Sequence, residues 1–310
     1  MQDERGFSLI ELLVAMLIML IISGAATAAL LKMTSTQATI WNRTQMHSGI
    51  RGATEVLQQE VGQAGRVALP SAVSLNGDVT TTGSSVTVAV TCSAGSNCAG
   101  GIFPTEFLTI DAGAKQETVQ ISGVTTSPAQ ITANFAYTHS SGATVAAFGA
   151  FQAGVVAPSA ANGSTGTVLK LFGDINGDGN MVYVEYTCDT STVPGNLYRN
   201  SMAWNTGAKV AATASQILLS NIIANPGGTA CFTYQTSTMS GYGDFVTNVA
   251  VTLTVQTQQL DPVTKTYQTE TKALLDVAPR NIVNAAALAF MQQLPLRVQP
   301  TPAAITNLLP

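Results

Sequence analysis

The amino-acid sequence predicts an α+β protein in which one long N-terminal helix packs on an antiparallel β-rich C-terminal domain. Three observations predict this class. No proline occurs before Pro70, so nothing interrupts a helix over residues 7–65. The run Leu12–Leu31 holds no charged residue, and its length matches the ~20 residues that a helix needs to cross a membrane. After Pro70, short alternating runs are separated by Gly, Ser, Asn and Pro, which is typical of antiparallel strands.

The first half of the helix, residues 7–33, is expected to span a membrane. Glu11 stands at its start, where an ionised carboxylate is costly unless it has a partner. An ordinary secretory signal peptide is one alternative, but its leader is basic, whereas here Asp3 and Glu4 outnumber Arg5. A plain signal anchor is the other alternative, and it gives no reason for a glutamate at this position.

The second half, residues 34–66, is expected to be amphipathic, with one apolar face packed on the following β-rich domain. The residues of this face recur at spacings of three and four: Met46, Ile50, Ala53, Leu57, Val61 and Ala64. The polar residues Gln58, Gln59 and Glu60 are expected to lie mostly off it. A break near residues 33–42, which would separate a membrane helix from an unrelated amphipathic helix, is the alternative that the sequence leaves open.

The β-rich domain is expected over residues 67–282. Its clearest strand candidates are runs in which valine, isoleucine or leucine alternates with other residues: Val86–Val90, Val119–Ile121 and Val249–Val255. Asp261-Pro262 supplies a turn, so Asn248–Gln258 and Thr264–Leu275 are expected to pair as a hairpin. No alternation of strands and helices appears, which disfavours a parallel sheet.

Residues 283–310 are expected to form a C-terminal helix and tail. A short helix is expected over residues 283–292. The Pro-rich end after Leu294 is expected to be loose.

Four cysteines lie beyond the uncharged run, and an even number is typical of disulfides in an oxidising compartment. Three pairings are open. The sequence favours Cys92–Cys98, which closes a short loop, together with Cys188–Cys231, which joins two predicted strands. A metal site is the alternative, but neither spacing is C-x-x-C, and His47 and His139 are remote in sequence.

The segment D-I-N-G-D-G-N, with a later glutamate, fits the calcium-loop pattern D-x-[DN]-x-[DN]-G-x5-E. The candidate Ca²⁺ ligands are Asp174, Asn176, Asp178 and Asn180, with Glu185 the least expected member. The flanks resemble strands rather than helices, so Glu185 would lie ~16 Å from Asn180 and would need a bulge to reach the same ion. The alternative is a β-hairpin in which Asn-Gly and Asp-Gly simply make the turn.

Composition and motifs disfavour two classes of function. Charged residues make up 10% of the chain and the net charge is −4, so no basic nucleic-acid surface and no nucleic-acid partner are expected. No G-x-S-x-G, H-E-x-x-H or Walker loop occurs, and we expect no enzyme. His139 is expected to be a solvated loop histidine, and Trp41 and Trp204 are expected in core or interface positions.

The segment Gly6-Phe7-Ser8-Leu9-Ile10-Glu11 and the uncharged run after it resemble the class III signal and methylation motif of type IV pilins and pseudopilins. The resemblance implies that residues 1–6 are a leader, which a prepilin peptidase removes after Gly6 before it methylates Phe7. It also implies that Glu11 pairs with the free amine of Phe7 of a neighbouring subunit during filament assembly. The acidic leader departs from the basic one that is usual in the family.

Four later segments look like those of large minor pilins of the PilW type: Leu57–Arg66, the D-x-N-G-D-G turn, Leu197–Arg199 and Pro279–Asn281. This resemblance implies a minor pilin that is incorporated into, or primes, a type IV pilus. Its implied partners are other major and minor pilins, the prepilin peptidase and the inner-membrane assembly platform. It implies a single-pass inner-membrane protein with a periplasmic domain before assembly, and a cell-surface pilus afterwards.

Two other functions stay open at this stage. One is a pseudopilin of a type II secretion system, because the N-terminal motif serves both machines. The other is an adhesive tip module, for which residues 71–165, the part least similar to such minor pilins, are the candidate surface.

Overall fold

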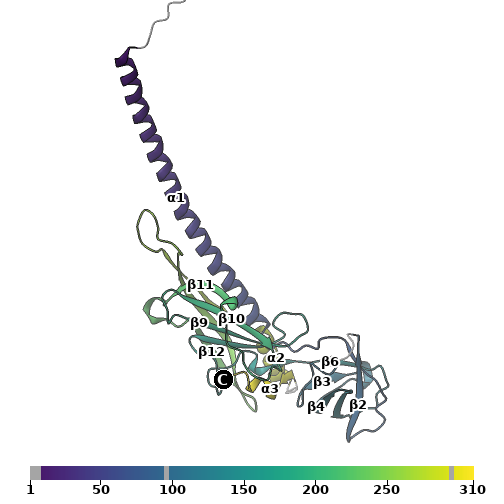
Figure 1. Ribbon diagram of the computed structural model, residues 1–310. Helices are drawn as coiled ribbons and strands as arrows, with labels where there is room; N and C mark the ends of the chain where they lie inside the picture. The colour runs from purple at the N-terminus through teal and green to yellow at the C-terminus, as the bar shows by residue number, and fades with distance from the viewer. Residues whose placement is uncertain (1–7, 94–97, 293–296) are drawn as a thin grey trace, which may run out of the picture.

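The computed structural model describes residues 8–93, 98–292 and 297–310. It has the predicted α+β architecture: helix α1 (Leu9–Gln63) projects from a β-rich body that contains a closed barrel and a seven-stranded sheet (Figure 1). The helix runs without a break, so the alternative of two separate helices is wrong. The barrel lies at the end of the body that is farther from the N-terminal half of α1.

The C-terminal half of α1 packs on the sheet through the predicted apolar face. All six of its predicted residues are buried: Met46, Ile50, Ala53, Leu57, Val61 and Ala64. They share one core with apolar residues of the sheet, including Leu169, Val249 and Leu253. Burial of this face, at about 25 cal/mol per Å² of apolar surface, fixes the helix to the body.

The sheet has the strand order β12-β13-β11-β10-β9-β8, and β14 also pairs with the long strand β13. Its strands are β8 (Val168–Gly173), β9 (Val182–Asp189), β10 (Gly195–Ala203), β11 (Ile217–Ile223), β12 (Phe232–Met239), β13 (Gly243–Gln256) and β14 (Thr269–Val277). All of these pairings are antiparallel. The predicted hairpin is confirmed as β13–β14, but its connection is longer than expected, because β13 ends at Gln256 instead of Gln258 and β14 begins at Thr269 instead of Thr264.

The barrel is closed in the order β1-β2-β5-β4-β3-β6. Its strands are β1 (Val73–Leu75), β2 (Ser85–Cys92), β3 (Phe107–Ile110), β4 (Glu117–Thr126), β5 (Ala129–Asn134) and β6 (Thr144–Ala147). It has a hydrophobic core of its own, built around residues such as Leu108, Ile131 and Phe135. The sequence predicts strands here but does not separate the barrel from the sheet.

The C-terminal segment packs against the body. Helix α2 (Arg280–Gln292) confirms the predicted helix, β15 (Val298–Gln299) pairs in parallel with β7 (Ala150–Phe151), and α3 (Ala303–Thr306) follows. The expectation of a loose end is wrong for residues 297–310, because Ile305 and Leu308 are buried in a cluster with Phe151 and Phe172. Apolar side chains between the prolines supply the burial that orders this segment.

Four short 3₁₀ helices complete the described elements. They are η1 (Gly113–Lys115), η2 (Gln152–Gly154), η3 (Ala214–Gln216) and η4 (Pro226–Gly228).

Candidate functional site

The N-terminal half of α1 is an apolar surface that nothing else in the described chain covers. None of residues 9–34 is buried. The helix is long and apolar enough to cross a membrane, judged by length and composition. Exposed apolar surface of this extent requires lipid or other helices around it.

Glu11 lies in the first turn of this exposed half. The Ser8 N–H donates a hydrogen bond to Glu11 Oε2 at 3.3 Å, an interaction that helps to start the helix. Gly6 and Phe7, the predicted cleavage and methylation positions, lie outside the described residues. The pairing of Glu11 with a neighbouring amine therefore stays a prediction.

At its other end, α1 is anchored by a charged network. Arg199 on β10 contacts Glu60 of α1 through Nε, at 2.9 and 3.1 Å from the two carboxylate oxygens, and through Nη2 at 2.6 Å. The Tyr186 hydroxyl donates to Glu60 Oε2 at 2.5 Å. Burial and the Glu60 carboxylate raise the pKa of Tyr186. Burial opposes the charge of Arg199, but its hydrogen bonds to the Glu60 carboxylate raise the pKa of the guanidinium.

The structure corrects the prediction for Glu60. The sequence places this residue off the buried face, but it is buried in the anchor. Helical periodicity assigns a polar residue to solvent, and it carries no information about a cation on a distant strand. The only sequence signal was that Glu60 and Arg199 both fall in segments similar to those of large minor pilins.

The residues that follow α1 are tightly packed against the C-terminal segment. The Asn281 side-chain amide donates to the Gln63 carbonyl at 3.0 Å and caps the helix end. Gly65 follows with a φ of +80°, and a Cβ there would lie 2.6 Å from the Ile282 side chain and 2.9 Å from the Phe151 carbonyl oxygen. Only glycine fits such a position without displacing its neighbours.

The D-I-N-G-D-G-N segment is the turn between β8 and β9, as the hairpin alternative predicts. Asp174 is buried, and its Oδ1 accepts hydrogen bonds from the Asp178 N–H at 3.0 Å and the Gly179 N–H at 3.3 Å. Arg66 Nε lies 3.4 Å from the other oxygen of Asp174. The turn is therefore held by its own carboxylate and contacts the residues that follow α1.

These contacts do not fit a calcium site well. Glu185 is occupied elsewhere, because it accepts hydrogen bonds from Lys209 at 3.0 Å and from the Tyr183 hydroxyl at 2.7 Å. Among the described residues, no group of three or more His, Cys, Asp or Glu side chains is placed to hold a metal ion. The Asp174, Asn176, Asp178 and Asn180 site stays a prediction, which titration calorimetry with Ca²⁺ would check.

Four segments that are far apart in sequence thus meet around one end of α1: Leu57–Arg66, the D-x-N-G-D-G turn, Leu197–Arg199 and Pro279–Asn281. Leu57–Arg66 contributes Glu60 and Arg66, and the other three contribute Arg199, Asp174 and Asn281. We call this set of five residues the helix anchor. It is formed by side chains that are far apart in sequence.

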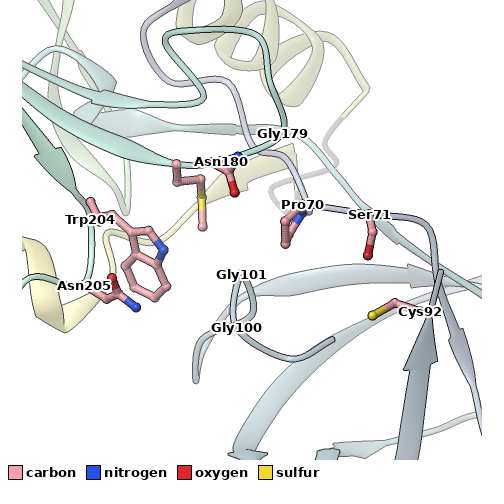
Figure 2. Close-up of a pocket in the computed structure, with 11 residues that line it drawn as sticks. Pro70, Ser71, Cys92, Gly100, Gly101, Gly179, Asn180, Trp204 and Asn205 are labelled. Carbon is pink, nitrogen blue, oxygen red and sulfur yellow. The ribbon is translucent and has the colours of Figure 1, made fainter. Parts of the chain in front are cut away.

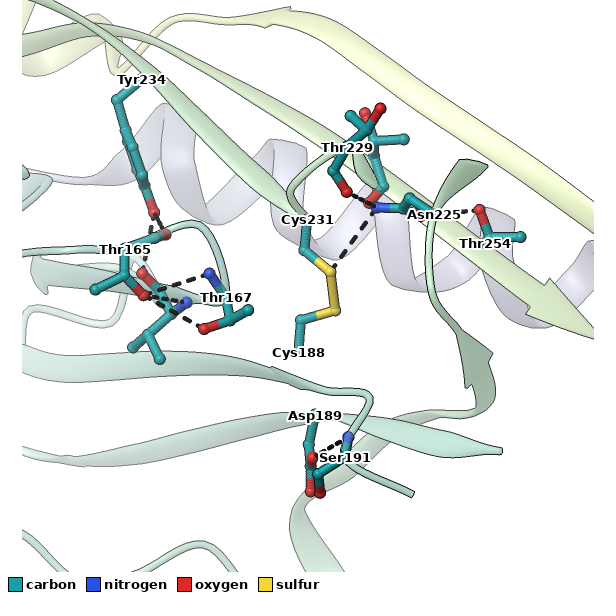
Figure 3. Close-up of a disulfide and its surroundings, with 12 residues drawn as sticks. Thr165, Thr167, Cys188, Asp189, Ser191, Asn225, Thr229, Cys231, Tyr234 and Thr254 are labelled. Carbon is teal, nitrogen blue, oxygen red and sulfur yellow. Dashed lines mark hydrogen bonds between the residues drawn. A yellow bond between two sulfur atoms is a disulfide. The ribbon is translucent and has the colours of Figure 1, made fainter. Parts of the chain in front are cut away.

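The two disulfides of the described chain are Cys92–Cys98 and Cys188–Cys231, and no cysteine is free. This is the pairing that the sequence favours, rather than the metal alternative. Figure 3 shows Cys188–Cys231 linking β9 to the start of β12 beside Asn225. The Asn225 amide donates to the Thr229 carbonyl at 3.1 Å and to the Thr252 carbonyl at 2.8 Å, which stabilises this edge of the core.

His139 is buried in the barrel, so the prediction of a solvated histidine is wrong. Its Nδ1 lies 3.1 Å from Asp111 Oδ2, and its Nε2 lies 2.7 Å from Glu117 Oε1. The hydrogen bond with His139 lowers the pKa of Asp111. With no exposed side-chain surface, His139 acts as a structural link between β3, β4 and the loop before β6.

A hollow of about 350 Å³ lies between the barrel and the sheet (Figure 2). Trp204, Asn180 and Asn205 line its sheet side, and Pro70 and Gly101 line the opposite side. Trp204 packs edge-on against Phe103 with ring centroids 5.8 Å apart, which confirms an interface position. Trp41, in contrast, is 72% exposed, so it does not lie in the core, and its interface position stays a prediction.

The described chain combines an exposed apolar N-terminal helix with a disulfide-bonded β-rich body. Residues 1–27 match the family described as "Prokaryotic N-terminal methylation motif". Over this segment the chain is similar to type IV pilins and pseudopilins, which carry this motif at the start of a long apolar helix. Comparison with curated proteins gives no match, and neither does comparison with solved structures.

The class III signal implies processing by prepilin peptidase and pilus-type assembly from a membrane-anchored precursor. Proteins of this class are generally structural and non-enzymatic.

Proposed function

We propose that this chain is a minor pilin, a structural subunit that is incorporated into a type IV pilus or primes its assembly. The observation that carries the proposal is the exposed apolar half of α1, which has Glu11 in its first turn. The other half of α1 is fixed to the body by the helix anchor. Cleavage after Gly6 would create an amine at Phe7 that Glu11 of a neighbouring subunit pairs with. Lateral packing of equivalent helices would then bury the apolar surface, and the charge pair would set their stagger.

In this proposal, the precursor spans the inner membrane once and holds residues 67–310 in the periplasm. It leaves the membrane for a surface pilus with the help of the assembly platform. The partners are other major and minor pilins. The resemblance of the anchor segments to large minor pilins of the PilW type supports the pilus over the secretion pseudopilus.

Substitution of Glu11 by alanine tests the assembly role. We expect leader cleavage to continue. Co-purification with other pilins should fall by roughly tenfold, because loss of the charge pair is expected to weaken subunit association by ~1.4 kcal/mol. Lys32→Gln, at the other end of the span, is the matched control and should keep normal recovery. Unchanged recovery of Glu11→Ala with the other pilins would rule out the charge pair.

Two further measurements separate the candidate functions. Mass spectrometry of the native N-terminus should find methylated Phe7, whereas a retained Met1 would contradict the class. Loss of twitching in a deletion strain supports the pilus, and loss of exoprotein secretion supports a pseudopilin.

An adhesive tip module is a second candidate, favoured by one observation. The barrel has its own core and lies away from the membrane-spanning half of α1 (Figure 1). Binding of the protein to cells should then depend on the barrel surface and not on Glu11.

A further inference from the structure

The loop between β13 and β14, residues 257–268, extends beside α1 toward the membrane-spanning half of the helix (Figure 1). It presents apolar side chains to solvent, and Val263 at its tip is 68% exposed. On α1, Ile40 and Trp41 are exposed at a similar level, and Trp41 shares a surface hollow with Gln259. We call the exposed set the loop-tip surface: Ile40, Trp41, Leu260, Val263, Lys265 and Tyr267.

The loop is held by hydrogen bonds of its own. Asp261 is buried and its Oδ1 accepts hydrogen bonds from the Val263 N–H at 2.8 Å and the Thr264 N–H at 2.9 Å. The loop is closed by main-chain bonds between Asp261 and Lys265 at 2.8 Å and between Asp261 and Thr266 at 3.0 Å. The apolar side chains therefore point outward in an ordered loop, which favours a role in contact with a partner.

The strands that carry the loop are tied to α1. Arg43 donates a hydrogen bond to Gln268, and His47 pairs with Glu270. These contacts keep the loop at a set height along the helix, so its tip has a defined position relative to the membrane span.

That height lies close to the expected membrane surface. Asp261 lies against Thr39, about two helical turns beyond Lys32, or ~10 Å along the axis. The polar layer of a bilayer is ~5–8 Å thick on each side. If the helix tilts by ~20° toward the side of the loop, a loop ~10 Å from the helix axis moves ~3 Å closer to the membrane surface. The loop tip then enters the headgroup layer.

The chemistry of the surface fits this layer. Tryptophan and tyrosine are enriched at membrane interfaces, and Trp41 and Tyr267 provide both. The one exposed charge on the loop is Lys265, since Asp261 is buried, and a lysine is attracted to anionic phospholipid. The surface lies about two helical turns beyond the exposed apolar span, which ends near Met33, and the mostly polar run 34–39 separates the two.

We propose that the loop-tip surface rests on the headgroup layer of an anionic phospholipid bilayer while α1 spans it, so that the β-rich body is held tilted on the membrane. The proposal rests on the membrane-anchored stage of the proposed function. It adds a second membrane contact that must be released when the subunit enters a filament.

The two tryptophans of the chain allow a direct test. In the full chain carrying Trp204→Phe, Trp41 is the only tryptophan, and the protein is reconstituted in vesicles of phosphatidylethanolamine and phosphatidylglycerol. We expect nitroxide lipids labelled at the headgroup to quench Trp41 severalfold more than lipids labelled deep in the acyl chain. In the Trp41→Phe chain, Trp204 should be quenched by neither.

A charge-reversed tip provides the matched comparison. Val263→Asp with Lys265→Glu should reduce headgroup quenching of Trp41 severalfold. Val210→Asp, at a position that is 60% exposed in the loop before β11, should leave it unchanged. Quenching of Trp41 that does not respond to the tip variant would overturn the docking.

The same vesicles distinguish failure of docking from failure of the proposed function. If the chain resists alkaline extraction while Trp41 stays unquenched, the span is present and only the docking is overturned. If the chain is extracted, the membrane-anchored stage fails, and the docking fails with it.

Discussion

Replacing Arg199 by alanine is expected to lower the free energy of unfolding of the β-rich body by about 3 kcal/mol. The substitution leaves the Glu60 carboxylate mostly buried with no opposing charge, since its remaining partner is the Tyr186 hydroxyl. Removal of one member of a buried pair is costly because the other member keeps its desolvation penalty. Urea unfolding of the detergent-solubilised full chain, followed by circular dichroism, measures the change.

The same helix offers a matched control. Arg51 pairs with Glu55 at 3.6 Å, but both side chains are largely exposed. Arg51→Ala should therefore cost only about 0.5 kcal/mol. The double variant Glu60→Leu with Arg199→Met removes both charges and should recover part of the loss. An effect of Arg199→Ala no larger than that of Arg51→Ala would contradict the anchor.

Glu106 is expected to make the protein less stable as pH rises from about 4.5 to about 8. It is fully buried just before β3. Its Oε1 has no hydrogen-bond partner among the residues that the structure describes, while Oε2 accepts from the Phe103 N–H at 3.1 Å. Burial raises the pKa of Glu106 to about 8, although the Phe103 bond opposes the shift. In this window the unfolded chain loses a proton that the folded chain keeps, so stability falls with pH.

The loss should level off above pH 8, after a total on the order of 5 kcal/mol. Glu106→Gln keeps an acceptor for Phe103 and removes the ionisation, so its stability should vary little over this window. Urea unfolding at several pH values measures how the free energy of unfolding changes with pH. Unfolding is followed by the fluorescence of Trp204, which packs against Phe103, in a Trp41→Phe background. Glu55→Gln is the exposed control, and an unchanged slope in Glu106→Gln would contradict the assignment.

Much of the fold could be predicted because it depends on local patterns. The helical spacing of Met46, Ile50 and Leu57 predicts the buried face of α1, and the structure confirms it. Alternation along Val249–Val255 and the turn at Asp261 predict the β13–β14 hairpin. Each pattern repeats with the period of its own secondary structure, so neighbouring residues carry the information.

The barrel and the packed C-terminal segment could not be predicted in the same way. Closure of the barrel depends on pairing between β1 and β6, which are separated by four intervening strands. Gln299 binds the main chain of Phe107 and Phe148, and so ties the C-terminal segment to the barrel. The proline content of residues 297–310 predicts a segment without fixed structure. A few apolar residues between the prolines become buried, and composition does not reveal them.

The sequence by itself determined the class of this protein: the methylation motif, Glu11 and the uncharged run lie within one short continuous segment. Tertiary structure alone decided how that segment is held. Glu60 and Arg199 are separated by 139 positions, and His139 meets Asp111 and Glu117 only after the barrel closes. A charged side chain is exposed or buried according to the partner that folding brings to it, and local periodicity does not contain that partner.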